Sequence, residues 1–197
     1  MQKFDELRRE RFLRADELAR LIRELSDHPN RRAANAVRLL LLTGARRNEV
    51  LSATWDQFDL ERGVWIKPSS HTKQKRLHRV PLSGAAKDLL AKMKLAAVEG
   101  GYSSPYIFPG DATGKPLGDI KNFWRSVCRK AAIQDFRLHD LRHQYASILA
   151  SSGQSLPIIG QLLGHTQTGT TARYAHLFDD PLRAATEQVG ALLTQDP

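Results

Sequence analysis

Two polar residues three positions apart form a candidate phosphate-binding pair. His139 and Arg142 belong to the segment His-Asp-Leu-Arg-His, inside a stretch whose apolar spacing predicts a helix over 139–151. Positions i and i+3 share one helix face, so the imidazole and the guanidinium point to the same place. A guanidinium holds two phosphate oxygens in its planar fork, and a neighbouring imidazole accepts a proton or donates a hydrogen bond. For this segment alone, a solvated polar face explains the pattern equally well.

A second cation–carboxylate pair follows a glycine turn. Arg46 opens a predicted short helix after Gly44, and Glu49 comes three residues later. An ordinary intrahelical ion pair, worth at most about 0.5 kcal/mol, accounts for this spacing. The functional alternative makes Arg46 a second phosphate clamp, with Glu49 holding it in position.

Basic residues also concentrate between two predicted strands. Lys73 lies in the polar connection, where an ammonium on a flexible stem can reach a groove and give a proton to a departing oxygen. The alternative is a solvated charge run. Lys75, Arg76 and Arg79 are interpreted as solvated charges or as contacts to phosphate groups.

Tyr174 is the candidate nucleophile. A phenol has a pKa near 10, so its ionisation at pH 7 costs about 4 kcal/mol. Two arginines on the same phosphate lower that cost, and a nearby imidazole can take the proton. Without such neighbours a tyrosine packs in a core or an interface. Tyr145, three residues after Arg142, is the second candidate, although an aromatic residue there is better explained by packing.

A metal site and a disulfide are both disfavoured. His139 and His143 are four residues apart, but Asp140 stands where a zincin motif requires Glu. Arg142 would also place a positive charge beside the cation. Cys128 is the single cysteine, so no intrachain disulfide can form, and we interpret it as a small core residue.

Composition limits the class of protein and of partner. The 197 residues suffice for one domain with a sizeable core, and 41% hydrophobic with 26% charged residues is typical of a soluble globular protein. The formal net charge of +9 favours a polyanion, nucleic acid before a membrane surface. No segment has membrane-spanning length, and residues 1–14 lack the apolar region of a signal peptide. We therefore expect a cytoplasmic protein.

The apolar spacing predicts a mainly helical domain with a small antiparallel sheet. The expected helices cover 16–25, 30–43, 46–53, 85–97, 117–132, 139–151, 156–163, 170–177 and 181–193, and the expected strands cover 63–67 and 76–82. Residues 100–116 are expected to form a loop.

Taken together and in this order, the polar segments resemble the tyrosine recombinase (phage integrase) family. The resemblance covers the chain from about residue 14 to 177, and each motif is weak by itself. The matching positions are Thr43, Gly44, Arg46 and Glu49 in the first box, the segment 55–59, Lys73 before Val80-Pro81-Leu82, His139 with Arg142, His165 in a Leu-Gly-His box, and Tyr174 before Ala175-His176.

The resemblance implies both a fold and a mechanism. The fold is that of the family's catalytic domain. Tyr174 would attack a DNA phosphodiester to give a 3′-phosphotyrosine and a free 5′-hydroxyl. Arg46 and Arg142 would bind the non-bridging oxygens, His165 would donate a further hydrogen bond, His139 would serve as base or proton shuttle, and Lys73 would be the general acid. Glu49 would support Arg46 from behind. No metal ion and no cofactor are implied.

The resemblance also sets expectations for domains and partners. Residues 1–197 form one catalytic domain, without the family's N-terminal core-binding and arm-binding domains, so the chain is either a fragment or naturally short. The partners are double-stranded DNA attachment sites, with a tetramer on DNA for the full-length protein and a monomer for the isolated domain. Segment 181–197 is a candidate docking segment, the alternative being that it folds back on its own domain.

Two other functions remain open. A type IB topoisomerase-like enzyme has a similar active site but works as a monomer without site preference. A DNA-binding module without catalysis is the second, although it has no use for Tyr174 or Lys73.

Overall fold

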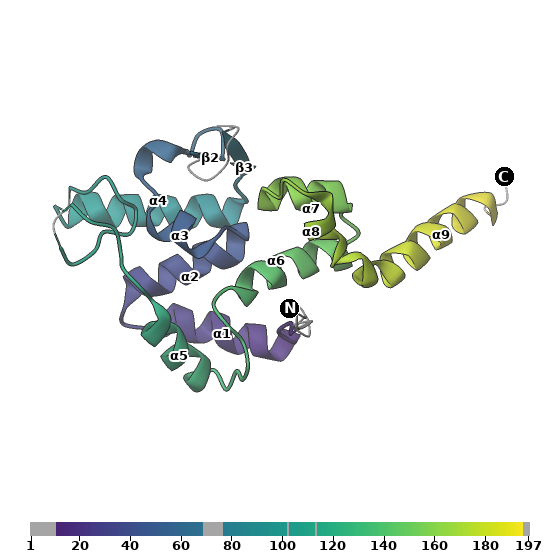
Figure 1. The fold of residues 1–197 in the computed structure, drawn as a ribbon, viewed down its shortest axis with the longest axis horizontal. Helices are drawn as coiled ribbons and strands as arrows, with labels where there is room; N and C mark the ends of the chain where they lie inside the picture. The colour runs from purple at the N-terminus through teal and green to yellow at the C-terminus, as the bar shows by residue number, and fades with distance from the viewer. Residues whose placement is uncertain (1–10, 69–76, 102, 113, 195–197) are drawn as a thin grey trace, which may run out of the picture.

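Helices dominate the computed structural model, which describes residues 11–68, 77–101, 103–112 and 114–194 (Figure 1). The predicted fold class is confirmed: helices accompany a small antiparallel sheet. The α-helices are α1 (Ala15–Asp27), α2 (Arg31–Thr43), α3 (Arg47–Leu51), α4 (Gly84–Glu99), α5 (Lys121–Lys130), α6 (Asp140–Ser151), α7 (Leu156–Leu163), α8 (Thr168–Ala172) and α9 (Asp179–Thr194). Two short 3₁₀ helices are η1 (Trp55–Gln57) and η2 (Ala175–Phe178), and the strands are β1 (Phe58–Asp59), β2 (Val64–Lys67) and β3 (His78–Pro81).

Local signals at both ends fix the length of α2. The Asn30 side chain accepts a hydrogen bond from the backbone N–H of Ala33, which satisfies one of the free donors of the first turn. Gly44 ends the helix in the left-handed region, with φ of 60°. A β-carbon at this glycine would lie 2.4 Å from the Tyr145 ring, so the residue is needed for space as well as for conformation. The C-terminal end of α2 is thereby packed directly against α6.

The sheet has the order β1-β2-β3 with antiparallel pairing throughout. Trp65 pairs with Phe58 on one side and with Val80 on the other, and the Phe58 and Trp65 rings stack at 4.9 Å. Both predicted strands are confirmed. β1 was not predicted, because two residues are too few to show a period. The connection predicted between the strands lies mostly outside the described residues.

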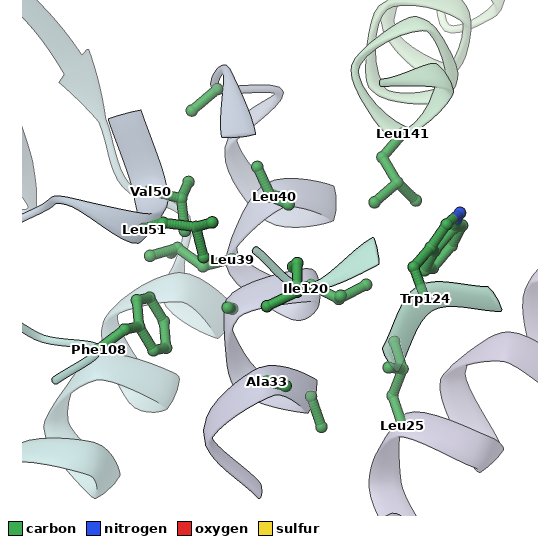
Figure 2. Packing of buried hydrophobic residues seen from close by; sticks show 14 of the residues in the cluster. Leu25, Ala33, Leu39, Leu40, Val50, Leu51, Phe108, Ile120, Trp124 and Leu141 are labelled. Atoms are coloured by element: carbon green, nitrogen blue, oxygen red, sulfur yellow. The ribbon is translucent and has the colours of Figure 1, made fainter. Parts of the chain in front are cut away.

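Two hydrophobic clusters form the core, and α6 contributes to both. The larger one surrounds α2, and Figure 2 shows Leu39 and Leu40 between Phe108 on one side and Trp124 and Leu141 on the other. The smaller one is built from Ala146, Ala150, Ile159, Leu163 and Tyr174. Because Leu141 belongs to the first cluster and Ala146 to the second, the start of α6 lies at their junction.

The predicted helix over 117–132 begins later in the structure. Leu117 donates its N–H to the carbonyl of Phe108, and Pro116 bridges to Pro109, so this stretch belongs to the preceding loop. The Asp119 side chain then accepts from the backbone N–H of Lys121 at the helix start. Cys128 is buried as predicted, and desolvation raises the pKa of its thiol to about 12.

The C-terminal helix α9 extends away from the rest of the protein in Figure 1. The described part of segment 181–197 therefore projects outward instead of lying along its own domain, and its docking role stays a prediction. Its exposed apolar side chains are Leu182, Val189, Leu192 and Leu193. In the part of the chain that the structure describes, no helix combines the length and apolar character needed to span a membrane.

Candidate active site

Arg142 joins two parts of the fold from the first turn of α6. Its side chain is buried, and its terminal nitrogens donate to the carbonyls of Gly44 at 2.8 Å and Leu163 at 2.7 Å. These carbonyls lie at the C-terminal ends of α2 and α7. Burial and the nearby charge of Arg46 lower the pKa of Arg142 to about 10, which leaves it protonated at neutral pH. A guanidinium carries five N–H groups, so three remain for an anion.

Arg46, Glu49 and Lys67 form a charge network at the start of α3. Glu49 accepts from the Arg46 backbone N–H at 3.1 Å and from its guanidinium at 2.8 Å, a contact that both the ion-pair and the positioning interpretations predict. The Lys67 ammonium, buried at the end of β2, donates to the same carboxylate at 3.0 Å. Lys67 was not predicted. Its side chain faces the core side of a strand, and sequence spacing does not reveal what it meets there.

The acid stability of the protein should depend on Glu49. Burial raises the pKa of this carboxyl, but the charge of Lys67 and the bonds from Arg46 outweigh it, and the pKa falls to about 2. Because this folded-state pKa lies below the ordinary value of 4.5, Glu49 stabilises the fold above about pH 4.5. The stabilisation, about 3 kcal/mol, is lost as the pH falls through the folded-state pKa.

Glu49→Gln should therefore lower the free energy of unfolding at pH 7 and make little difference near pH 2. Urea denaturation across this pH range measures the difference between wild type and variant. Exposed Glu61, for which Glu61→Gln is the matched control, should show almost no difference at either pH. A constant difference between wild type and Glu49→Gln at all pH values would contradict the assignment.

The Tyr174 hydroxyl contacts an imidazole, and that imidazole belongs to His143. The phenol oxygen lies 2.6 Å from the His143 Nδ1, and Tyr174 is only 2% exposed. Desolvation raises the pKa of Tyr174, while Arg173 and Arg142 act in the opposite direction. Burial and the charge of Arg173 lower the pKa of His143 to about 4. The family resemblance had implied that His139 would be the histidine that serves Tyr174 as base or proton shuttle.

His139 is exposed at the N-terminal end of α6. Its ring meets His143 edge-on, with centroids 5.2 Å apart. It also lines a hollow of about 400 Å³ beside Arg46 and Glu49. Desolvation and the charge of Arg142 lower its pKa. His139 therefore faces the hollow beside Arg46 rather than the phenol.

His165 follows α7 and lies within the same electrostatic cluster. Its Nδ1 is 2.8 Å from the Thr171 hydroxyl, and burial, Arg142 and Arg46 lower its pKa to about 4. His78, which was not singled out from the sequence, contacts the Gln161 carbonyl at 2.7 Å. Its ring occupies the space where a β-carbon of Gly164 would lie, so this glycine lets β3 approach α7.

The residue types, their order and their shared electrostatics now identify the family. The model described as "Phage integrase family" matches residues 11–180. The chain belongs to the phage integrase family. Among curated relatives, the integrase of Salmonella phage P22 is 29% identical over 94% of this chain and 48% of its own length. Tyrosine recombinase XerC of Xanthomonas axonopodis pv. citri is 29% identical over 84% of this chain and 53% of its own. This chain thus spans about half the length of these relatives.

A solved structure supports the same assignment for this integrase-family domain. The catalytic domain of bacteriophage HP1 integrase aligns with a TM-score of 0.65 and 26% identity, over 89% of this chain and 93% of that one. The predicted catalytic-domain fold is therefore confirmed.

The remaining predicted positions differ in their outcome. Lys73, Lys75 and Arg76 lie outside the described residues, and their roles stay predictions. Arg79 is exposed on β3, where a DNA contact is sterically open. Tyr145 packs against Gly44 and the second cluster, and desolvation raises its pKa, which fits the packing interpretation.

Proposed function

We propose that this integrase-family domain cuts and rejoins double-stranded DNA at attachment sites through a 3′-phosphotyrosine intermediate. One observation carries the proposal: the buried Tyr174 hydroxyl is bonded to an imidazole at 2.6 Å and lies within the electrostatic influence of Arg142. A tyrosine that only packs needs neither neighbour. Phosphoryl transfer requires positioning and charge stabilisation more than covalent help from the protein, and these groups supply both.

The cationic side chains divide the remaining work. Arg46 and Arg142 bind the non-bridging oxygens as negative charge grows on phosphorus, and His165 donates a further hydrogen bond. His139 lines the hollow beside Arg46 and serves as a proton shuttle there. Because guanidinium groups neutralise the developing charge, the reaction needs no metal ion. Removing one such donor should slow cleavage by about 10²- to 10³-fold.

Lys73 is proposed as the general acid for the 5′ oxygen. The support is the position of the residues that flank the connection between β2 and β3. Lys67, before it, bonds Glu49, and His78, after it, bonds the Gln161 carbonyl. Both ends of the connection thus start beside the clamps, and a lysine six residues beyond Lys67 has the reach to enter the site.

DNA and further copies of this chain are the proposed partners. The net charge of +9 favours a DNA backbone, with Lys75, Arg76 and Arg79 as candidate contacts. We propose that α9, whose apolar side chains are exposed, docks on a neighbouring copy in a tetramer on DNA. The isolated domain is then a monomer in solution.

Trapping the covalent intermediate tests the function. The chain is incubated at low salt and in EDTA with a pool of nicked duplexes of randomised sequence. Cleavage near the nick releases a short fragment that carries the new 5′-hydroxyl, and its loss by diffusion blocks religation. After denaturation and trypsin digestion, mass spectrometry should find a nucleotide on the peptide 174–183, which begins after Arg173. Tyr145 lies on a different tryptic peptide, 143–173.

Each outcome separates the three functions considered. An adduct on peptide 174–183 supports the proposal, and an adduct on 143–173 moves the nucleophile to Tyr145. Absence of any adduct favours a DNA-binding module without catalysis. Relaxation of a supercoiled plasmid that lacks an attachment site would instead favour the topoisomerase-like function.

A further inference from the structure

The proton on the Tyr174 hydroxyl must leave before or while the oxygen attacks phosphorus. A general base for that proton must lie within about 2.6–3.2 Å of the hydroxyl oxygen. In the part of the chain that the structure describes, the imidazole at this distance is that of His143, at 2.6 Å. We propose that His143 is the catalytic general base that takes the phenol proton during cleavage and returns it during religation. This rests on the function proposed above.

The helix geometry explains why His143 and Arg142 do different work. Successive residues on an α-helix point about 100° apart, so neighbours on α6 face different elements. Arg142 turns toward the ends of α2 and α7, where it donates to Gly44 and Leu163. His143 turns toward the segment after α8, and its ring centroid lies 6.1 Å from that of Tyr174. One turn of α6 thus carries both a phosphate clamp and the contact to the nucleophile.

Burial first, and then the nearby positive charges, lower the pKa of His143 and keep its imidazole neutral before DNA binds. The titratable and charged groups near His143 come from two sides. His139, Asp140 and Arg142 lie at the start of α6, and Arg173, Tyr174 and His165 lie on the segments packed opposite. The phenol has the proton to donate, so Nδ1 accepts and the ring carries its hydrogen on Nε2. A neutral imidazole with its Nδ1 lone pair on the phenol is the form that a general base requires.

The proton transfer balances within the cleavage step. The Tyr174 oxygen forms a bond to phosphorus, the bond from phosphorus to the 5′ oxygen breaks, and the phenol proton passes to His143 Nδ1. The 5′ oxygen receives its proton from the general acid, for which Lys73 is proposed. As the new bond forms, the phenol oxygen loses its basicity, and an incoming phosphate stabilises an imidazolium nearby. Religation reverses each transfer, so His143 returns the proton to the phenol.

His139 does not fit this role in the observed geometry. It lies four residues earlier, at the N-cap of α6, is exposed, and forms a T-shaped ring pair with His143 rather than a contact to the phenol. Its place at the hollow suits a contact to phosphate or a second proton carrier behind His143. The proposal therefore separates two histidines that the sequence pattern alone does not distinguish.

His143→Asn tests the proposal with minimal change of shape. The Asn carbonyl oxygen occupies nearly the position of Nδ1, so it still accepts a hydrogen bond from the phenol but does not take the proton. Adduct formation is followed in single turnover on the nicked duplex pool. We expect a fall of about 10²- to 10⁴-fold in rate, with unchanged DNA binding. His28→Asn is the matched control. It makes the same substitution at a histidine whose ring contacts Phe123 instead of the phenol, and it should leave the rate unchanged.

A fluorinated tyrosine at position 174 separates proton transfer from positioning. Several fluorine atoms on the ring lower the pKa of the phenol well below that of tyrosine, so the reaction depends less on a base. Placed in His143→Asn, it should restore most of the lost rate, which also shows that the variant is folded. Placed in Arg142→Ala, it should restore little, because the phosphate clamp is still missing.

Three results would overturn the proposal while leaving the function standing. One is a wild-type rate for His143→Asn. Another is a loss that the fluorinated tyrosine does not relieve, which would make His143 a structural residue. The last is a larger, relievable loss in His139→Asn than in His143→Asn. If wild type itself forms no adduct on peptide 174–183, the proposed function fails instead.

Discussion

Tyr174→Phe is expected to abolish the covalent DNA adduct while leaving the fold and the DNA affinity nearly intact. The substitution removes the attacking oxygen, and no other described tyrosine hydroxyl is bonded to an imidazole. The ring stays packed with Ala146, Ala150 and Leu163 in the second cluster. The lost hydrogen bond to His143 should lower the free energy of unfolding by about 1 kcal/mol. Denaturing gels measure the adduct, filter binding the affinity, and urea denaturation the stability.

Tyr145→Phe is the matched control, because it removes the same hydroxyl from a half-buried tyrosine on α6. Its ring packs against Gly44, and this contact does not need the oxygen. The control should form adduct at the wild-type rate. Survival of the adduct in Tyr174→Phe, or its loss in Tyr145→Phe, would show that the nucleophile is misassigned.

Arg142→Ala is expected to damage both catalysis and stability. Loss of the phosphate clamp should slow cleavage by about 10²- to 10³-fold or more. Truncation also leaves the carbonyls of Gly44 and Leu163 without their donors in a buried place. Each unsatisfied buried group costs about 1–3 kcal/mol, so the free energy of unfolding should fall by roughly 2–6 kcal/mol. Single-turnover cleavage and urea denaturation measure the two effects.

Two further variants separate the effect on the cleavage rate from the effect on the free energy of unfolding. Arg142→Lys retains the positive charge but presents a compact ammonium instead of a planar fork, so it should recover part of the stability and little of the rate. Arg137→Ala removes an exposed arginine just before α6 and should change neither. A full-rate Arg142→Lys would mean that charge alone, without the fork, is sufficient at this position.

The double role of Arg142 follows from where α6 begins. The helix starts between the two hydrophobic clusters, and its third residue, Arg142, contacts the ends of both α2 and α7. Gly44 and Leu163 are separated by more than a hundred residues in sequence. An arginine that fixes their relative position also fixes the distance between the clamp at Arg46 and the histidine after α7. The structural role and the proposed catalytic role are thus combined in one side chain.

Local sequence determined most of the helices. Apolar periodicity predicted α1 and α2, and Asn30 and Gly44 marked the ends of α2, because a cap acts within a few residues of itself. The same reasoning missed β1 and placed the start of α5 too early. Both depend on hydrogen-bonded pairing with a neighbouring segment, Trp65 of β2 in one case and the Phe108 carbonyl in the other, and helix periodicity does not record such pairing.

By itself, the sequence determined the family and the mainly helical fold, and it named candidate site residues, because motif order and helix period are properties of the linear chain. Tertiary structure alone decided which of them touch. The Tyr174 hydroxyl forms its hydrogen bond with His143 instead of His139, and the ammonium of Lys67 on β2 donates to the carboxylate of Glu49 on α3. Both choices depend on how α6 and β2 are rotated against their neighbours. That rotation is set by core packing over the whole domain, so no local pattern records it.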